Sequence, residues 1–249
     1  MKKLEGKVAV VTGGSSGIGL ATTQEFVQQG AHVFITGRRK EELDRVVKEL
    51  GPNVTAVQGD VANLADLDRL YAEVKKQGKR IDIVFANAGV GEFQSIGEIT
   101  EESFDKMFNI NVKGLLFTVQ KALPLFNDGG SIILNASVAS SKGLEAFGVY
   151  SATKAAVRSF ARTWTLELKT RQIRVNAISP GPIDTPIFGT LSSSPDELKQ
   201  IKAGLASGVP LGRMGRPDEI AKVALFLAST DSSFVAGTEL FVDGGLAQV

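Results

Sequence analysis

The 249-residue sequence contains no cysteine, which excludes disulfides, a thiol nucleophile and thiolate metal sites. This absence is typical of a reducing compartment. No stretch approaches the ~18 consecutive apolar residues of a membrane span. The apolar run at residues 8–11 is also shorter than the core of a signal peptide, which has about 7–15 residues. We therefore expect a cytoplasmic protein.

The sequence has only one histidine, His32, and this scarcity helps to interpret residues 11–19, VTGGSSGIG. Gly13, Ser15 and Gly17 match Gly-x-Ser-x-Gly, the nucleophile elbow of serine hydrolases. Such a hydrolase takes its histidine well beyond the serine, after the acid. His32 follows Ser15 too closely and opens an apolar run, so a structural histidine is favoured. Zinc sites built on several histidines are excluded as well, and we expect no metal.

Neither sign of charge is in excess, because 28 basic side chains face 27 acidic ones. The balance gives no global electrostatic reason to expect nucleic acid or an anionic membrane as a partner. The length suits one large core and is short for two full domains. We expect a single domain over residues 1–249.

The sequence does contain a regular alternation of apolar strand-like runs with helical patterns. Strands are predicted at residues 7–12, 32–36, 54–58, 81–86, 131–135, 174–178 and 239–242. Helices are predicted at residues 17–29, 40–50, 64–76, 103–126, 149–169 and 217–227. Continuously apolar strands favour an α/β fold, a doubly wound parallel sheet of about seven strands with helices on both faces (Rossmann fold). The Gly/Ser/Pro-rich segment 181–210 is predicted to be an irregular, mobile substrate flap.

The glycines from Gly13 to Gly19 lie where the first predicted strand meets the first helix. Glycine permits a tight turn and a close approach of the backbone to a phosphate, which the helix N-terminus attracts. The spacing Gly-x-x-x-Gly-x-Gly differs from the standard Gly-x-Gly-x-x-Gly, and a simple tight turn is the alternative. The strand–turn–helix context favours dinucleotide binding.

The end of the second predicted strand indicates which dinucleotide binds. An NAD site usually carries an acid there, which bonds the ribose hydroxyls. Here Gly37 is followed by Arg38 and Arg39, whose guanidinium groups match the 2′-phosphate of NADP. The alternative is a solvated basic loop that Glu41 and Glu42 neutralise. We favour NADP (NADPH) and keep NAD as possible.

Tyr150 and Lys154 lie one turn apart at the start of a predicted helix. A lysine ammonium beside a phenol lowers the pKa of the phenol and makes it a usable acid–base. Such a pair is common on amphipathic helices and means little alone. However, Ser137 follows the fifth strand and residues 87–89 follow the fourth. All of these groups are expected at one edge of the sheet, beside the glycine loop.

With these residues in place, the sequence resembles the classical short-chain dehydrogenase/reductase family over essentially the whole chain, from Lys7 to Gly245. The matching segments, in chain order, are Thr12-Gly13-Gly14-Ser15-Ser16-Gly17-Ile18-Gly19, Asp60-Val61, Asn87-Ala88-Gly89, Asn111, Ser137, Tyr150 with Lys154, Pro180-Gly181 and Asp243-Gly244-Gly245. Each match is modest alone, but the set in this order and spacing is highly specific.

The resemblance implies a catalytic tetrad. Ser137 would orient and polarise the substrate carbonyl, and Tyr150 would transfer a proton. Lys154 would lower the pKa of Tyr150 and bond the nicotinamide ribose, and Asn111 would hold a water that relays protons to Lys154.

The resemblance also implies the residues of the cofactor site. They are Gly13, Ser15, Ser16, Gly17, Ile18, Gly19, Gly37, Arg38, Arg39, Asp60, Val61, Asn87, Ala88, Gly89, Tyr150, Lys154, Pro180, Gly181, Ile183 and Thr185. Within this set Asp60 and Val61 would contact the adenine, Asn87 the adenine-side ribose region, and residues 180–185 the nicotinamide.

Three residues depart from the family pattern. Ser16 stands where many NADP-dependent members place a basic residue, so NADP rests on Arg38 and Arg39. Ala86 stands where asparagine is common, and little effect is expected. Val138 stands where a second serine is frequent, and it would make the substrate side more apolar.

The expected activity is NADPH-dependent reduction of a ketone, or oxidation of a secondary alcohol, by hydride transfer. Alternatives in the same family are a 3-ketoacyl-thioester reductase and a sugar dehydrogenase. A non-catalytic NADP-binding sensor could lose Tyr150 or Lys154, and a nucleotide-sugar epimerase would need a longer chain. The substrate-pocket candidates are Glu92, Phe93, Val138, Leu144, Phe147, Ile187 and Phe188. The resemblance further implies a homotetramer formed through residues 103–126 and 149–169.

Overall fold

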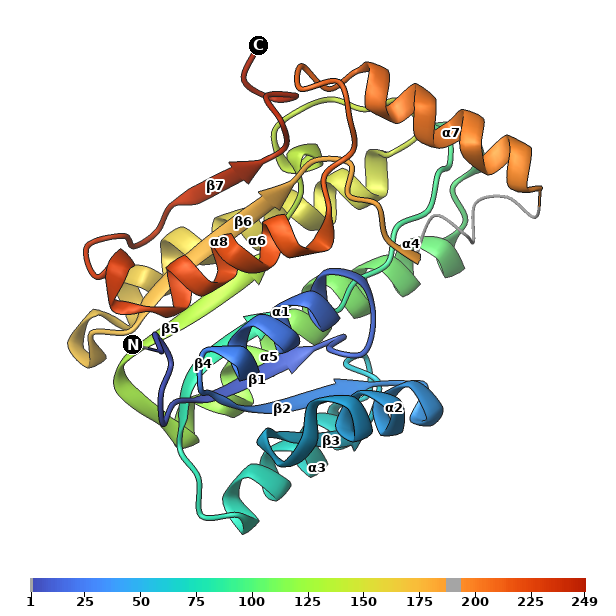
Figure 1. Cartoon of the computed structure of the whole chain (residues 1–249). Coiled ribbons are helices and arrows are strands. Elements are labelled where there is room, and N and C mark those ends of the chain that lie inside the picture. The colour runs from blue at the N-terminus through green and yellow to red at the C-terminus, as the bar shows by residue number, and fades with distance from the viewer. Residues whose placement is uncertain (1, 187–193) are drawn as a thin grey trace.

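Figure 1 shows the computed structural model of the chain, which describes residues 2–186 and 194–249. Within them one seven-stranded sheet has the order β3-β2-β1-β4-β5-β6-β7, and every neighbouring pair is parallel. The strands are β1 (Val8–Thr12), β2 (His32–Gly37), β3 (Val54–Gln58), β4 (Ile81–Ala86), β5 (Phe126–Asn135), β6 (Arg174–Pro180) and β7 (Glu239–Val242). The predicted Rossmann fold is confirmed.

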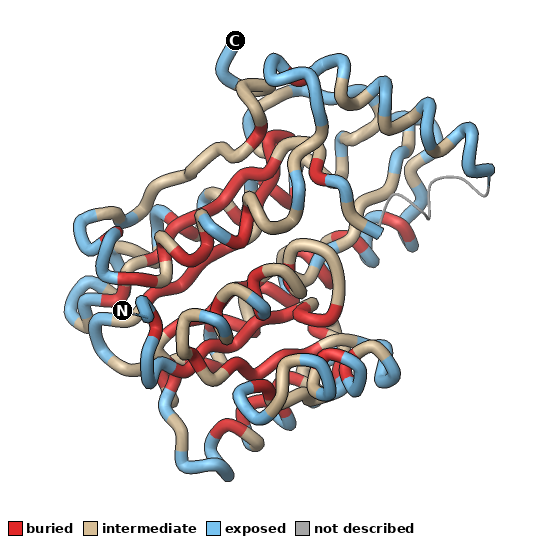
Figure 2. The backbone as a smooth tube through the Cα atoms, in the orientation of Figure 1, coloured by how far each residue is buried: buried red, intermediate tan, exposed pale blue. Residues whose placement is uncertain are grey.

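Helices cover both faces of the sheet (Figure 1). The α-helices are α1 (Gly17–Gln28), α2 (Lys40–Leu50), α3 (Leu64–Lys76), α4 (Glu101–Phe108), α5 (Leu115–Ala122), α6 (Gly148–Glu167), α7 (Pro195–Ser207) and α8 (Pro217–Ala228). One core packs α1, α2 and α8 against the sheet, and the other packs α3, α5 and α6 against the opposite face. Figure 2 shows the buried residues concentrated in the strands between these two layers.

The helix predicted at residues 103–126 is divided. After α4 the chain forms a π-helical segment, Asn109–Gly114, then α5 and a 3₁₀ turn, Leu123–Leu125. The predicted helix end at Phe126 is wrong, because this residue already begins β5 by pairing with Ile81. Pro124 in the 3₁₀ turn lacks the N–H that an α-helix needs. π-Helical turns occur frequently at functional sites, and this one contains Asn111.

Within the segment 181–210, the prediction of irregular structure is wrong for Pro195–Ser207, which form α7. The Ser194 side chain accepts a hydrogen bond from the backbone N–H of Glu197, and Pro195 takes the first helical position. Both features favour the start of a helix. The other boundaries of the predicted elements lie within two residues of the observed ones, apart from the earlier start of β5.

The single histidine has the structural place that was expected. His32 begins β2, and its Nε2 lies 3.0 Å from the Thr55 Oγ1 on the neighbouring strand. Burial, with a smaller contribution from Lys79, lowers its pKa. Val8 and His32 face each other at the start of two parallel strands, whereas Ser15 follows the opposite end of β1. The fold therefore keeps His32 away from Ser15, and a Ser15–His32 nucleophile pair is excluded.

None of the described helices is both long and apolar enough to span a bilayer.

Candidate active site

The glycine loop joins β1 to α1 at the carboxyl edge of the sheet. Gly13 and Gly17 have φ angles of +68° and +52°, in the region that favours glycine. A Cβ on Gly19 would lie 2.1 Å from the carbonyl oxygen of Gly13, so no side chain fits there. Ser16 precedes α1, and its hydroxyl caps no helical N–H among the described residues. The first N–H groups of α1 can therefore bind an anion, and the loop fits a dinucleotide phosphate.

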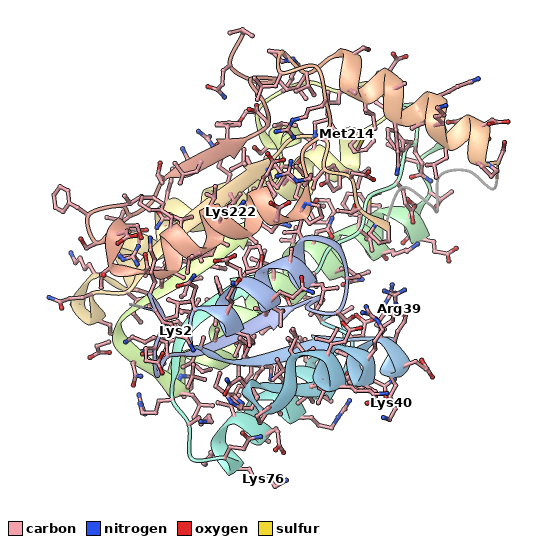
Figure 3. The ribbon with its side chains drawn as sticks, viewed as in Figure 1. Lys2, Arg39, Lys40, Lys76, Met214 and Lys222 are labelled. Carbon is pink, nitrogen blue, oxygen red and sulfur yellow. The ribbon has the colours of Figure 1, made fainter. Side chains whose placement is uncertain are left out.

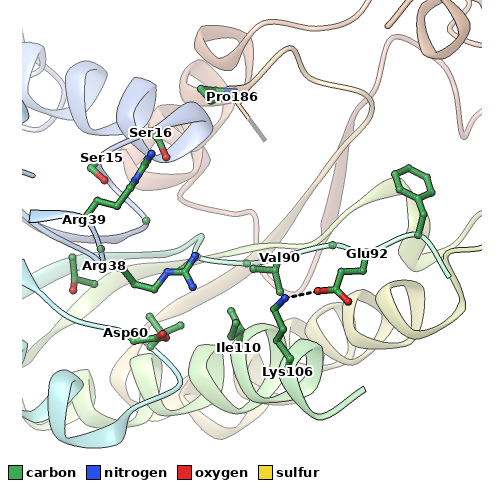
Figure 4. Close-up of a pocket in the computed structure, with 18 of the residues that line it drawn as sticks. Ser15, Ser16, Arg38, Arg39, Asp60, Val90, Glu92, Lys106, Ile110 and Pro186 are labelled. Atoms are coloured by element: carbon green, nitrogen blue, oxygen red, sulfur yellow. Dashed lines mark hydrogen bonds and ion pairs between the residues drawn. The ribbon is translucent and has the colours of Figure 1, made fainter. Parts of the chain in front are cut away.

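A cavity of about 1260 Å³ opens beside this loop. Figure 4 shows Arg39 reaching toward Ser15 and Ser16, while Arg38 lies between this group and Asp60. Ten of the expected cofactor residues line the cavity, namely Gly13, Ser15, Ser16, Gly37, Arg38, Arg39, Asp60, Val61, Ala88 and Gly89.

The side chains of Arg38 and Arg39 form no ion pair within the described part of the chain. The proposed neutraliser Glu42 binds Arg45 instead, at 2.9 Å. Figure 3 shows Lys40 next to Arg39, but Lys40 is paired with Asp44 at 2.5 Å. This end of the cavity therefore presents two guanidinium groups with no described counter-ion.

The loop after β3 is held in place by hydrogen bonds from its backbone N–H groups to two carboxylates. The Asp60 N–H donates to the Asp66 carboxylate (2.8 Å), and the Asp60 carboxylate accepts from the Ala62 N–H (2.9 Å). Val61 packs on Gly114, where an added Cβ would lie 2.9 Å from the Val61 side chain. The loop therefore stays against the π-helical segment and faces the cavity.

The Asn87 side chain is hydrogen-bonded to two neighbouring strand ends. Its Nδ2 donates to the carbonyl oxygen of Thr12 (2.9 Å), and its Oδ1 accepts from the Nδ2 of Asn135 (2.9 Å). The Thr12 hydroxyl oxygen in turn accepts hydrogen bonds from the backbone N–H groups of Asn87 and Ala88, both at 3.0 Å. The Asn87 side chain thus ties together the ends of β1, β4 and β5 and is not among the cavity-lining residues.

Lys154 is almost completely buried on α6, with 4% of its surface exposed. Its Nζ donates to the carbonyl oxygen of Asn135 at 2.8 Å and lies 5.5 Å from the centroid of the Tyr150 ring. Burial lowers the pKa of Lys154 to about 8. The ammonium is therefore placed between the end of β5 and Tyr150 by one backbone hydrogen bond.

Tyr150 lies one turn before Lys154, near the start of α6. Burial raises the pKa of Tyr150, and its interaction with the Ser137 side chain lowers it by less. The expected lowering by Lys154 is not found, because the ammonium is directed to the Asn135 carbonyl and burial penalises the phenolate. Ser137 and Tyr150 are brought together as expected.

The Asn111 side chain is fully engaged by its neighbours. Its Oδ1 accepts from the N–H of Val90 (2.9 Å), and its Nδ2 donates to the Val90 carbonyl (2.8 Å) and to Thr153 Oγ1 (3.1 Å). A Cβ on Gly89 would lie 3.2 Å from Asn111 Oδ1 and 3.5 Å from Lys154 Nζ. Asn111 and Lys154 therefore converge on Gly89, which lines the cavity.

The residues after β6 approach the glycine loop from the far side. Pro180 ends β6, and a Cβ on Gly181 would lie 2.7 Å from the Cα of Asp243, so the two segments are in close contact. Ile183 is buried and forms an isolated bridge with Gly215.

Thr185 reaches the cofactor loop directly. A Cβ on Gly17 would lie 3.3 Å from the Thr185 methyl group, so the hydroxyl-bearing side chain covers the N-terminus of α1. The structure thus places Thr185 beside the glycine loop. Residues 180–185 are absent from the described cavity lining, which the next residue, Pro186, joins.

Two of the seven expected substrate residues line the other end of the cavity. Glu92 and Phe93 line it, whereas Val138 is buried, and Leu144 and Phe147 are not among its lining residues. Ile187 and Phe188 lie outside the described residues.

The lining also contains residues that the sequence did not single out. They are Val90, Gly91, Gln94, Lys106, Ile110, Pro186, Ile201, Gly204 and Leu205, with Thr36 and Gly59 at the cofactor end. Lys106 forms an ion pair with Glu92. The Glu92 carboxylate also accepts a hydrogen bond from the Ser103 hydroxyl at 2.9 Å. Both contacts lower the pKa of Glu92. No local pattern marks Lys106, but Gly91 stands two residues beyond the recognised segment 87–89, where a glycine signal could have been noticed.

The strand order and the glycine loop beside β1 define a dinucleotide-binding protein of the Rossmann type. A family model described as "Enoyl-(Acyl carrier protein) reductase" matches residues 13–247. The chain is 48% identical to "Oxidoreductase asL5" of Sarocladium schorii over 251 residues, covering 100% of this chain and 99% of the relative. It is 40% identical to the 3-oxoacyl-[acyl-carrier-protein] reductase FabG of Thermotoga maritima, covering 98% and 99%.

A solved structure from Brucella melitensis, described as a short-chain dehydrogenase/reductase and glucose/ribitol dehydrogenase, aligns with a TM-score of 0.93 and 31% identity. The alignment covers 100% of both chains. The chain belongs to the short-chain dehydrogenase/reductase family. It is accordingly an oxidoreductase that acts on CH–OH or C=O groups with a nicotinamide dinucleotide.

Proposed function

We propose that this protein is an NADPH-dependent carbonyl reductase with Ser137, Tyr150, Lys154 and Asn111 as its catalytic tetrad. One observation carries the proposal. Asn111 and Lys154 pack on Gly89, Tyr150 packs on Gly91, and these two glycines line the same cavity as Arg38 and Arg39, which have no ion-pair partner among the described residues. The proton donor would thus lie directly behind the wall of the cavity whose other end carries two guanidinium groups for a phosphate.

The bound dinucleotide would supply the hydride, while the side chains position the carbonyl and supply the proton. Ser137 would donate a hydrogen bond to the carbonyl oxygen, and Tyr150 would transfer its phenolic proton to that oxygen. The raised pKa of Tyr150 keeps the phenol protonated near neutral pH, which suits the reductive direction. Lys154, held by Asn135, would stabilise the phenolate that the transfer leaves.

NADP is preferred over NAD in this proposal because of the chemistry at the end of β2. Arg38 and Arg39 face the cavity, and the acid that would bond the ribose hydroxyls of NAD is missing from this strand end. The cofactor roles of the other expected residues, from Gly13 to Thr185, are part of the same proposal. We do not assign Asn87 a direct contact, because its side chain is used by Thr12 and Asn135.

A 3-ketoacyl-thioester reductase is the second candidate, supported by the 40% identity to the Thermotoga maritima protein. The Brucella melitensis glucose/ribitol dehydrogenase supports a sugar dehydrogenase less strongly, at 31% identity. We also propose that residues 1–249 form one domain around the single sheet. The homotetramer and the cytoplasmic location stay predictions.

The test is turnover with a panel of ketones and NADPH or NADH, for the wild type and for Tyr150→Phe. We expect ketone-dependent oxidation of NADPH by the wild type and a kcat lowered by about 10²–10⁴-fold in the variant. The affinity for NADPH, followed by nicotinamide fluorescence, is expected to change less than about twofold.

The matched control is Tyr71→Phe, which removes the hydroxyl of a buried tyrosine whose partner is the Thr118 carbonyl, away from the cavity. It should keep the wild-type kcat. Full activity of Tyr150→Phe would refute the proton-donor assignment. A wild type that binds NADPH and reduces no ketone would indicate the non-catalytic sensor instead.

A further inference from the structure

Three aromatic rings form a row from Tyr150 to Phe93, which lines the cavity. Tyr150 and Phe147 meet edge to face, with ring centroids 5.0 Å apart and an interplanar angle of 82°. Phe147 and Phe93 repeat this arrangement at 4.1 Å and 69°. Phe93 lines the cavity and is 51% exposed, so part of its ring surface is open to a ligand.

This aromatic row is fixed by backbone contacts between two loops. The N–H of Gln94 donates to the carbonyl oxygen of Ala146 at 2.8 Å, next to Phe93 and Phe147 respectively. Ala146 has a φ of +59°, a conformation that a non-glycine residue rarely adopts. On the other side, a Cβ on Gly91 would lie 3.3 Å from two atoms of the Tyr150 ring. These contacts therefore hold the ring of Phe93 in place at the cavity.

Apolar side chains from α7 also line the cavity. Ile201 and Leu205 are one turn apart on this helix, and Gly204 between them adds no side chain. The cavity is thus lined by the ring of Phe93 and by aliphatic groups from α7.

Charge is balanced at this end of the cavity. Among the described residues that line it, Glu92 and Lys106 are the charged ones, and they form an ion pair with each other (Figure 4). Ser103 donates a further hydrogen bond to Glu92. A carboxylate or phosphate on the substrate would have to compete with Glu92 for Lys106, so this end favours an uncharged ligand.

We propose that the substrate is an uncharged ketone whose carbonyl belongs to a flat aromatic or conjugated ring system, which packs against Phe93. The inference rests on the proposed carbonyl reductase function and narrows its substrate class. Aromatic rings gain from edge-to-face and offset contacts beyond the area that they bury. A sugar or polyol would instead place hydroxyl groups against phenyl and aliphatic surface, where they lose hydrogen bonds to water.

The experiment compares two ketones of the same carbon skeleton, 2-tetralone with its aromatic ring and 2-decalone with that ring saturated. The wild type is expected to favour 2-tetralone by about 3- to 10-fold in kcat/KM. Phe93→Leu keeps an apolar side chain and removes the ring, so it should reduce this preference to less than about twofold. The change should appear as a raised KM for 2-tetralone, with kcat within about twofold.

Phe234→Leu is the control, because Phe234 is fully exposed and does not line the cavity. It should keep the wild-type preference. Equal kcat/KM for both ketones in the wild type, an unchanged preference in Phe93→Leu, or faster turnover of fructose or ribitol than of 2-tetralone would overturn the inference while leaving a working oxidoreductase. A wild type that turns over no ketone and no polyol would overturn the proposed function, and the inference with it.

Discussion

The two ends of the cavity both contain basic side chains, yet they differ in how these are paired. At the cofactor end Arg38 and Arg39 have no ion-pair partner among the described residues. At the substrate end Lys106 is paired with Glu92 (Figure 4). A buried or partly enclosed anion gains most from a cation that is not already neutralised. Basic side chains therefore suit an anion at the cofactor end, where they are unpaired. At the substrate end the paired Lys106 contributes to a neutral surface.

The two ends are also built from different parts of the fold. The cofactor end consists of backbone at the strand ends, such as the glycine loop and the turn after β2. The substrate end includes side chains from residues 92–94, from Lys106 on α4 and from α7. A backbone cradle can serve one cofactor in many enzymes, whereas side chains can change without disturbing the sheet.

The largest effect is expected at Lys154, where the two ends meet. Lys154→Met should lower kcat by about 10²–10³-fold, because the phenolate of Tyr150 loses the nearby ammonium. In the wild type the lowered pKa, about 8, predicts that the ammonium and the reductive rate are lost as the pH rises through that value. A pH–rate profile checks this, and Lys154→Arg should move the loss to higher pH. A flat profile for the wild type up to about pH 10 would contradict it.

Lys154 also gives a stability signature with a definite sign. A folded-state pKa below the ordinary 10.5 means that the folded protein binds fewer protons than the unfolded chain between about pH 8 and 10.5. The charged lysine therefore destabilises the fold below pH 8, and this cost disappears as the pH rises through that window. At about pH 7 the Met variant should melt higher than wild type, on the order of 5 °C, with the gap closing by about pH 10. A Met variant that melts lower at neutral pH would show that the Asn135 contact outweighs burial of the charge.

The next largest effect is expected from the unpaired arginines. Arg38→Ala or Arg39→Ala should raise the Kd of NADPH by about 10- to 100-fold, because charge-assisted bonds to the 2′-phosphate are lost. The Kd of NADH should change less than about threefold, since it lacks that phosphate. Fluorescence titrations with both cofactors measure this, and Lys40→Ala, whose side chain is paired with Asp44, is the control. Equal weakening of NADPH and NADH would remove the charge contrast between the two ends.

The sequence was most informative where the chemistry is contained in a short segment. Gly13–Gly19, Arg38–Arg39 and the pair Tyr150 and Lys154 each combine a strand or helix terminus with the residue types that the chemistry needs, and the structure brings them to one edge of the sheet. The start of α7 also had a local signal in Ser194 and Pro195. That signal was outweighed by the loop-like composition around it.

Phe93 and Phe147 were both expected near the substrate, but the contact between their rings could not be predicted, because they come from different loops and meet only in the folded chain. The same is true of the Asn135 carbonyl that binds Lys154. This contact also explains why the predicted direction of the Tyr150 pKa shift failed, since spacing on a helix does not reveal where an ammonium points. Pairing of Lys106 with Glu92 is another contact without a sequence pattern.

The smallest expected effect comes from making the two ends alike. Glu92→Gln keeps the shape of the side chain and a hydrogen-bond acceptor for Ser103 but leaves Lys106 without its carboxylate partner. The substrate end then carries one unpaired cation, as the cofactor end does. KM for 4-acetylbenzoate should fall by about two- to fivefold, because an exposed ion pair is worth little. KM for its uncharged methyl ester should stay within about 1.5-fold.

The double variant Glu92→Gln with Lys106→Met separates charge from shape. It should return KM for 4-acetylbenzoate to the wild-type value or above, because no cation is left to bind the carboxylate. If Glu92→Gln lowered KM for the acid and the ester equally, the gain would come from a looser cavity. The ion pair between Glu92 and Lys106 would then not be what disfavours anionic substrates. The difference in pairing between Lys106 and the two arginines would have no effect on which ligands bind.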